Sequence, residues 1–279
     1  MISCFDIQVG TSCNLNCKHC LMVDNLDCSP INYTKINKTL SNYSKIEEIH
    51  LSGGEPLLGD LDKLEEFIDN YPDTQFSMTT NLVYNLTDQR IRIIKKMNRI
   101  STSFDINIRF NDVRELNLWY HNLKKIKQFR SDIFVFVCLT NNLISKIKPS
   151  RITNFFGNKL KTNFTTIPLM RYGSNIKNNL ALILDKKEVI KWIQQLLILN
   201  NPYDLTKNLI KDKNFSNCQY GDSMICINNN GDIINCIINP NCKNNLDIKC
   251  TNCKYFINCG GSCPYIDCYY INRKEIQNE

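Results

Sequence analysis

Three cysteines near the start of the chain stand at a spacing suited to a metal cluster. Cys13, Cys17 and Cys20 form a C-x3-C-x2-C array. A 4Fe–4S cube has four iron corners, and three thiolates from one short loop hold three of them, which leaves one iron open. An open position distinguishes a reactive metal centre from a closed structural one. The alternative is a zinc site with His19 as fourth ligand, although residues so close on one loop would surround an ion poorly.

A second group of cysteines fills residues 210–279, which contain nine of the fifteen in the chain. A C-x12-G-x4-C segment runs from Cys218 to Cys236, and a C-x2-C-x5-C-x3-C segment runs from Cys250 to Cys263, followed by Cys268. Because C-x2-C pairs are also the usual ligands of zinc ribbons, this tail alone allows zinc or iron–sulfur. The array at Cys13 in the same chain favours iron–sulfur.

A glycine-rich turn, Gly53-Gly54-Glu55-Pro56, is the third candidate for chemistry. Glycines let backbone amides and carbonyls approach a small polar ligand closely. The alternative is an ordinary turn with a proline at the next helix entry.

Six β-like runs alternate with amphipathic segments through residues 1–209, whereas residues 210–279 show little periodicity. The predicted strands are Cys4–Val9, Glu48–Leu51, Gln75–Thr80, Ile100–Asp105, Ile133–Leu139 and Thr162–Leu169. The predicted helices are Asp60–Tyr71, with Asp60 as N-cap, Thr87–Asn98, Asn111–Arg130 and Lys186–Asn200.

Strand–helix units in series predict an α/β fold, a partial (β/α)6 TIM-like barrel over residues 1–209, with a cysteine-rich domain over residues 210–279. Functional groups in such folds gather at the carboxyl ends of the strands. The cysteine array follows strand one, the glycine turn follows strand two, and Asn81 follows strand three. This agreement supports the assignment of the strands.

Together, the cysteine array and the glycine turn resemble the radical S-adenosylmethionine (SAM) superfamily. In that family, the open iron binds the amino and carboxylate groups of SAM, and the reduced cluster cleaves SAM to a 5′-deoxyadenosyl radical. The tail is similar to the SPASM pattern, whose members mostly act on peptides and proteins and include relatives of anaerobic sulfatase maturases.

The resemblance implies a set of SAM contacts. His19 would lie near the adenine, and the glycine turn at the methionyl ammonium. The remaining candidates end or follow later strands, and each of them is by default a surface polar residue or part of an ordinary turn: Ser103, Asp105, Arg114, Asn141, Arg171 and Gly173. The implied cofactor-binding residues are His19, Gly53, Gly54, Glu55, Ser103, Asp105, Arg114, Asn141, Arg171 and Gly173.

The resemblance also implies two auxiliary 4Fe–4S clusters, three clusters in all. The ligands of the first would be Cys218, Cys226, Cys236 and Cys263, of which Cys226 is not specified by the motif, and those of the second Cys250, Cys253, Cys259 and Cys268. Cys4 and Cys138, inside strands, are expected to be small buried apolar residues. Cys28 and Cys242 fall in loop-like sequence and are candidates for returning hydrogen to a substrate radical.

The function expected from this resemblance is radical modification of a ribosomally made peptide, with a thioether or carbon–carbon cross-link ahead of epimerisation. A sulfatase-maturase activity is less favoured, because Ile237 stands where those enzymes have an aspartate base. A multi-cluster electron carrier, the non-enzymatic alternative, would leave the open-iron array unexplained.

The composition of the chain limits the classes of partner that we expect. The net charge of +7 is partly offset by the expected clusters, and the basic residues are scattered, so no nucleic acid is expected. With no signal peptide or spanning segment evident, many cysteines indicate the reducing cytoplasm and no membrane contact. The expected partners are a peptide, a flavodoxin or ferredoxin electron donor, and a separate leader-binding protein unless the barrel binds the peptide unaided.

Overall fold

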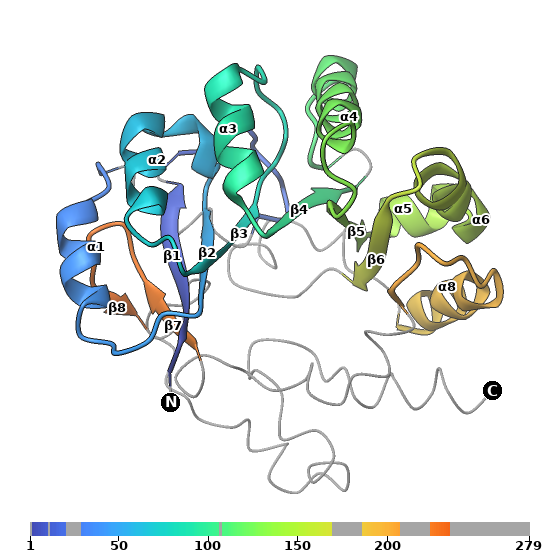
Figure 1. The fold of residues 1–279 in the computed structure, drawn as a ribbon. Coiled ribbons are helices and arrows are strands. Elements are labelled where there is room, and N and C mark those ends of the chain that lie inside the picture. The colour runs from blue at the N-terminus through green and yellow to red at the C-terminus, as the bar shows by residue number, and fades with distance from the viewer. Residues whose placement is uncertain are drawn as a thin grey trace, which may run out of the picture.

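The computed structural model describes residues 2–10, 12–20, 29–105, 108–168, 186–206 and 224–234. Within them, eight strands form one curved sheet in the order β6-β5-β4-β3-β2-β1-β7-β8 (Figure 1). Strands β1 to β6 are Cys4–Gly10, Glu48–Gly53, Gln75–Thr79, Arg99–Phe104, Phe134–Leu139 and Asn163–Pro168. Each is parallel to the next. The predicted α/β partial barrel is confirmed.

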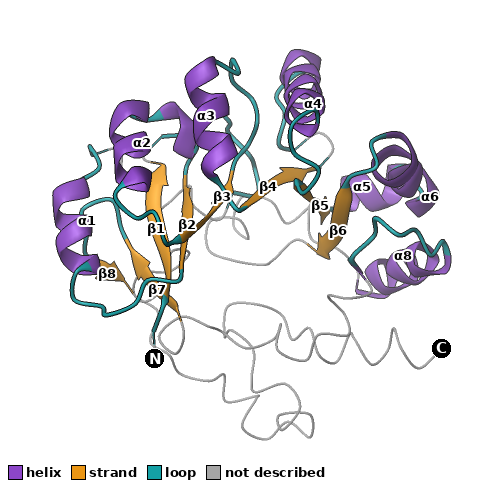
Figure 2. Ribbon diagram, in the orientation of Figure 1, coloured by secondary structure: helices purple, strands orange, loops and turns teal. Residues whose placement is uncertain are grey.

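Helices cover the outer face of the sheet and leave the inner face to the barrel interior (Figure 2). They are α1 (Tyr33–Leu40), the 3-10 turn η1 (Pro56–Leu58), α2 (Leu61–Asp69), α3 (Asp88–Lys96), α4 (Val113–Lys127), α5 (Asn141–Lys146), α6 (Pro149–Ile152), the π-helical segment η2 (Thr153–Lys159) and α8 (Lys186–Ile198). Asp60 caps α2 by accepting from the Lys63 amide, as predicted.

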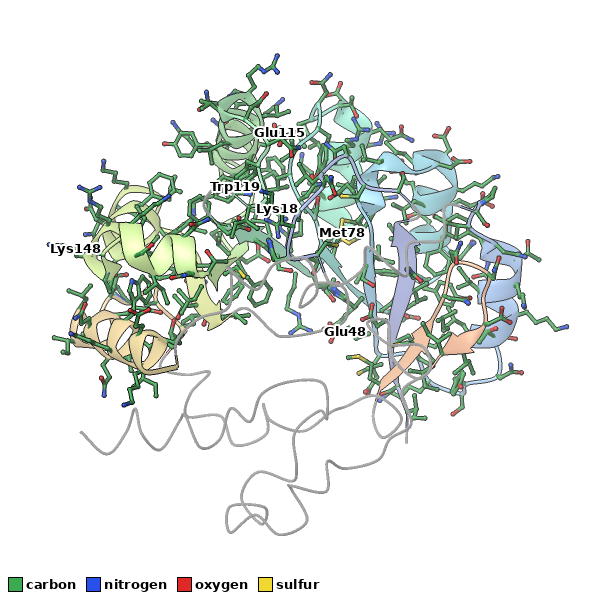
Figure 3. All side chains as sticks on the ribbon, turned by 180° about the vertical axis from the view of Figure 1, so that it is seen from behind. Lys18, Glu48, Met78, Glu115, Trp119 and Lys148 are labelled. Atoms are coloured by element: carbon green, nitrogen blue, oxygen red, sulfur yellow. The ribbon has the colours of Figure 1, made fainter. Side chains whose placement is uncertain are left out.

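Alternation along the strands separates the two faces. In β4, Ile100, Thr102 and Phe104 are buried, and Trp119 of α4 donates to the Thr102 hydroxyl from the helical layer, with an Nε1–Oγ1 distance of 3.1 Å (Figure 3). Ser101 and Ser103 are only partly buried, because they face the interior. The helical side of β4 therefore belongs to the apolar core, and its inner side presents two serine hydroxyls.

The sequence prediction missed two strands. β7 (Met224–Ile227) pairs in parallel with β1, and β8 (Ile233–Ile234) pairs antiparallel with β7. Both lie in the region that shows little periodicity, because each strand is short. The boundary at 209/210 stays a prediction, since the sheet takes strands from both sides of it.

Among the described residues, no helix combines the length and apolarity needed to cross a bilayer.

Candidate functional site

The cysteine array lies on the loop that follows β1, at the carboxyl edge of the parallel sheet. Cys13, Cys17 and Cys20 are each partly buried. Backbone hydrogen bonds fix this loop to its neighbours: the Glu55 amide donates to the Ser12 carbonyl (2.7 Å), and the Lys18 amide donates to the Ile108 carbonyl (3.3 Å). The array is therefore held by the segments that follow β2 and β4.

Two glycines let β1 and β2 approach closely at this edge. Gly53 has a φ of +110°, which side-chain-bearing residues rarely adopt, and a Cβ there would lie 2.5 Å from the Gly10 carbonyl oxygen. The Gly54 amide donates to that same oxygen at 2.6 Å. The amides of Gly54 and Glu55 are thus bound within the chain, and the predicted contact of Gly53 and Gly54 with SAM stays a prediction.

Glu55 is fully buried and braces this edge. Its carboxylate accepts from the Thr80 hydroxyl (2.7 Å), the Asn81 amide (2.5 Å) and the Leu57 amide (3.2 Å). Burial raises the pKa of Glu55 to about 7, although the hydrogen bonds oppose the shift. The carboxylate is enclosed among groups of this chain, so the structure adds a bracing role to the predicted ligand contact, which itself stays a prediction.

Asn81 connects this brace to the cysteines. Its side-chain amide donates to Cys13 Sγ at 3.5 Å and to Asn14 Oδ1 at 2.8 Å, while its Oδ1 accepts from the Val83 amide at 2.7 Å. We call Gly53, Glu55, Thr80 and Asn81 the edge cradle. A side-chain donor on a cysteine sulfur stabilises negative charge there, as an outer-shell partner of a metal ligand does.

A buried charged group lies on the other side of the loop. Asp105 Oδ2 is 3.4 Å from His19 Nε2 and 3.3 Å from Arg109 Nε, and its Oδ1 accepts from the Arg109 amide at 2.7 Å. Burial lowers the pKa of His19, so the neutral imidazole is favoured. The Cys17 thiol lies 3.9 Å from the Arg109 carbonyl oxygen. The structure thus brings together His19 and Asp105, both predicted, with Arg109, which was missed.

The remaining predicted residues are dispersed. Ser103 lies on the inner face of β4, level with Phe136 of β5. Arg114, in the first turn of α4, is 92% exposed. It pairs at 2.7 Å with Asp112, the residue that caps the start of α4. Asn141 is the first residue of α5. Cofactor contacts for all three stay predictions, and Arg171 and Gly173 lie outside the described residues.

Of the other cysteines, some lie within the described residues and some lie outside them. Cys4 and Cys138 were expected to be buried but are only partly buried, on the inner face, whereas Cys226 is buried in β7. The other tail cysteines lie outside the described residues, as do Cys28 and Cys242. The auxiliary clusters therefore stay a prediction.

The donor chemistry of the array suits an iron–sulfur cluster, since the Cys20 thiol lies close enough to raise the pKa of both Cys13 and Cys17. Burial is the larger effect and raises the pKa of Cys17 to about 12. Among the described residues, no three His, Cys, Asp or Glu side chains already converge as metal ligands. Binding of a cluster would therefore have to draw the thiolates together and release their protons.

No protein-family model and no curated protein matches this chain. Solved structures do resemble it. Native anSMEcpe, an anaerobic sulfatase maturing enzyme with bound AdoMet and Cp18Cys peptide, gives a TM-score of 0.71 at 15% identity over 98% of this chain and 95% of the other. SuiB of Streptococcus suis bound to S-adenosylmethionine gives 0.67 at 16% identity over 94% and 73%. The shared feature is the partial barrel of these radical SAM enzymes.

Proposed function

We propose that this chain is a radical SAM enzyme that modifies a peptide. The observation that carries the proposal is the position of Cys13, Cys17 and Cys20: a three-thiol loop at the carboxyl edge of a partial barrel, fixed by the edge cradle. Structures of the same fold have been solved with AdoMet and with a peptide, which supports both parts of the proposal.

Cys13, Cys17 and Cys20 would hold the cluster, and SAM would occupy its open iron. When bound, the pair would supply one-electron cleavage of a sulfonium and abstraction of a substrate hydrogen atom. Asn81 would stabilise the Cys13 thiolate through its amide donor. Asp105 would hold Arg109 and the neutral His19 beside the loop, so that the arginine charge is available next to Cys17.

The finer proposal concerns the product. Two auxiliary clusters in the tail would accept the electron released when a new bond closes on a substrate radical, and this favours a thioether or carbon–carbon cross-link. Ile237, in the position of the aspartate base of sulfatase maturases, disfavours formylglycine formation. An electron donor of the flavodoxin or ferredoxin type would reduce the first cluster.

SAM cleavage tests the enzymatic part. The anaerobically reconstituted full chain should bind about twelve irons, three cubes of four. With dithionite and SAM, it should form 5′-deoxyadenosine. A Cys17→Ala variant should lose that activity, whereas Cys4→Ala, a matched change on the inner face of β1, should retain it. Undiminished cleavage by the Cys17 variant would refute the assignment.

Mass spectrometry tests the peptide part. Candidate precursor peptides would be co-expressed with the chain and then analysed intact. Loss of a hydrogen pair per event indicates a cross-link, whereas an unchanged mass with deuterium gained from heavy water indicates epimerisation. Active SAM cleavage without any change in peptides would restrict the proposal to its first part.

A further inference from the structure

The inner face of the sheet carries a continuous chain of hydrogen-bonded side chains that the proposed chemistry does not use. It joins Ser101 of β4, Thr79 and Ser77 of β3, and His50 and Glu48 of β2. The distances are 2.9 Å between the Ser101 and Thr79 hydroxyls, 3.1 Å from Thr79 Oγ1 to His50 Nε2, 2.9 Å from His50 Nδ1 to Ser77 Oγ, and 2.9 Å from Ser77 Oγ to Glu48 Oε1.

The number of protons on each group fixes which partner donates in each of these four hydrogen bonds. The Glu48 carboxylate only accepts, so the one hydroxyl proton of Ser77 is donated to it. Ser77 must then accept from His50 Nδ1–H, which leaves the Nε2 lone pair of the neutral ring to accept from Thr79. Thr79 has no second proton, so Ser101 donates to Thr79. All four bonds therefore point from Ser101 to Glu48.

The chain of bonds runs from the interior toward solvent. Strand register places Glu48 at the amino edge of the sheet, where Arg99, 69% exposed, pairs with it. Ser101 lies closer to the carboxyl edge, two residues before Ser103 and four before Asp105. Ser77 is buried, whereas His50, Thr79 and Ser101 are partly exposed toward the interior.

Other charged groups lie near the histidine and complete its surroundings. Asp6 of β1 is level with His50 and accepts from the Ser52 hydroxyl at 2.6 Å. Glu48 lies two residues before His50 on the same strand face, with Cys4 of β1 level with it. Arg99 of β4 is level with Ser77. The imidazole thus lies near the carboxylates of Asp6 and Glu48, and Arg99 pairs with Glu48 at the amino edge.

We propose that Ser101, Thr79, His50, Ser77 and Glu48, the interior relay, carry a proton from the barrel interior to solvent at the amino edge. One proton enters at Ser101 Oγ, passes through Thr79 to His50 Nε2, and the Nδ1 proton leaves through Ser77 to Glu48. Each event moves one proton and no electrons. The inference rests on the proposed function only in taking the proton to be one that the substrate loses.

Nitrogen-15 NMR of the histidine-labelled, cluster-loaded full chain tests the direction of the bonds. A His50→Gln variant assigns the signal among the three histidines. We expect the neutral ring to be protonated at Nδ1. A Ser77→Ala change should shift the proton to Nε2, because Nδ1 loses its acceptor, whereas Thr79→Val should leave it on Nδ1. A wild-type ring protonated at Nε2 would overturn the relay.

Exchange of the His50 ring proton with water tests transport. Thr79→Val, which removes the hydroxyl but keeps the shape, should slow exchange by about ten-fold, the effect of one lost hydrogen bond. The matched Thr79→Ser variant keeps the hydroxyl and should exchange at the wild-type rate. Equal exchange in wild type and Thr79→Val would refute the relay. Assaying 5′-deoxyadenosine in the same samples separates the two proposals, because SAM cleavage without substrate does not need the relay.

Discussion

The edge cradle and the interior relay use similar residues for opposite purposes. In the cradle, the Glu55 carboxylate is fully buried and bonded to two backbone amides. In the relay, the Glu48 side chain is 25% exposed and bonded to side chains. Backbone partners cannot move without distorting the sheet edge, whereas hydroxyl and imidazole partners can exchange protons by rotating. The comparison indicates that one carboxylate fixes geometry and the other transfers charge.

Substitution of Gly53 should have the largest effect and would break the cradle. Gly53→Ala places a Cβ 2.5 Å from the Gly10 carbonyl at a φ of +110°, so we expect a loss of at least about 3 kcal/mol in unfolding free energy. Gly59→Ala is the control, because Gly59 has a φ of −77° and its nearest new contact would be 3.9 Å away. Denaturant unfolding measures both, and equal stabilities would contradict the strain described here.

The pH dependence of stability should reveal the buried carboxyl. The folded pKa of Glu55, about 7, lies above its ordinary value of 4.5, so folding favours the protonated form. Its stabilising contribution is complete below about pH 4.5 and is lost as pH rises through about 7, on the order of 3 kcal/mol. Glu55→Gln should flatten this part of the unfolding profile. An unchanged slope would show that Glu55 titrates normally.

Adjacent threonines sharpen the comparison most directly. Thr80 is 2% exposed, and its hydroxyl contacts both Glu55 and the Tyr84 hydroxyl, so Thr80→Val should cost about 2 kcal/mol. Thr79, partly exposed in the relay, should tolerate the same change at less than about 1 kcal/mol. Chemical unfolding of the two variants measures both costs. A larger cost at Thr79 would show that the relay is itself structural.

Loss of Asn81 should weaken the cluster more than the fold. Asn81→Ala removes the donor to Cys13 Sγ, so we expect about ten-fold faster loss of iron to a chelator, as for other outer-shell partners. Asn70→Ala, on an exposed residue that ends α2, is the matched control. Chelation followed by absorbance distinguishes them, and equal rates would remove Asn81 from the site.

Local patterns predicted much of the fold. Alternating runs identified β1 to β6, and the cap at Asp60 marked the start of α2. The short helices α1, α5 and α6 were missed because they offer fewer turns of periodicity. The strand β7 was missed because four residues carry little pattern of their own.

The site was predictable only where spacing along the chain defines it. The cysteine array and the glycine turn are local motifs, so they were found. Arg109 was missed, because only the tertiary fold turns it toward Asp105. The contact predicted for Arg114 stays a prediction. His50 gave no signal, since its partners depend on the lateral register of β2, β3 and β4.

The pairing of β7 with β1 has a consequence for how the protein is made. Met224 lies 220 positions after Cys4, its partner in the register. The β7–β8 turn also binds α1, through the Asn32 amide on the Asn229 carbonyl and the Thr39 hydroxyl on the Gly231 carbonyl. Contacts between such distant segments form late, because a long stretch of chain must be ordered first. During synthesis, β1, the strand that leads into Cys13, therefore cannot pair with β7 until most of the chain has left the ribosome. The cysteine loop would be fully supported only then.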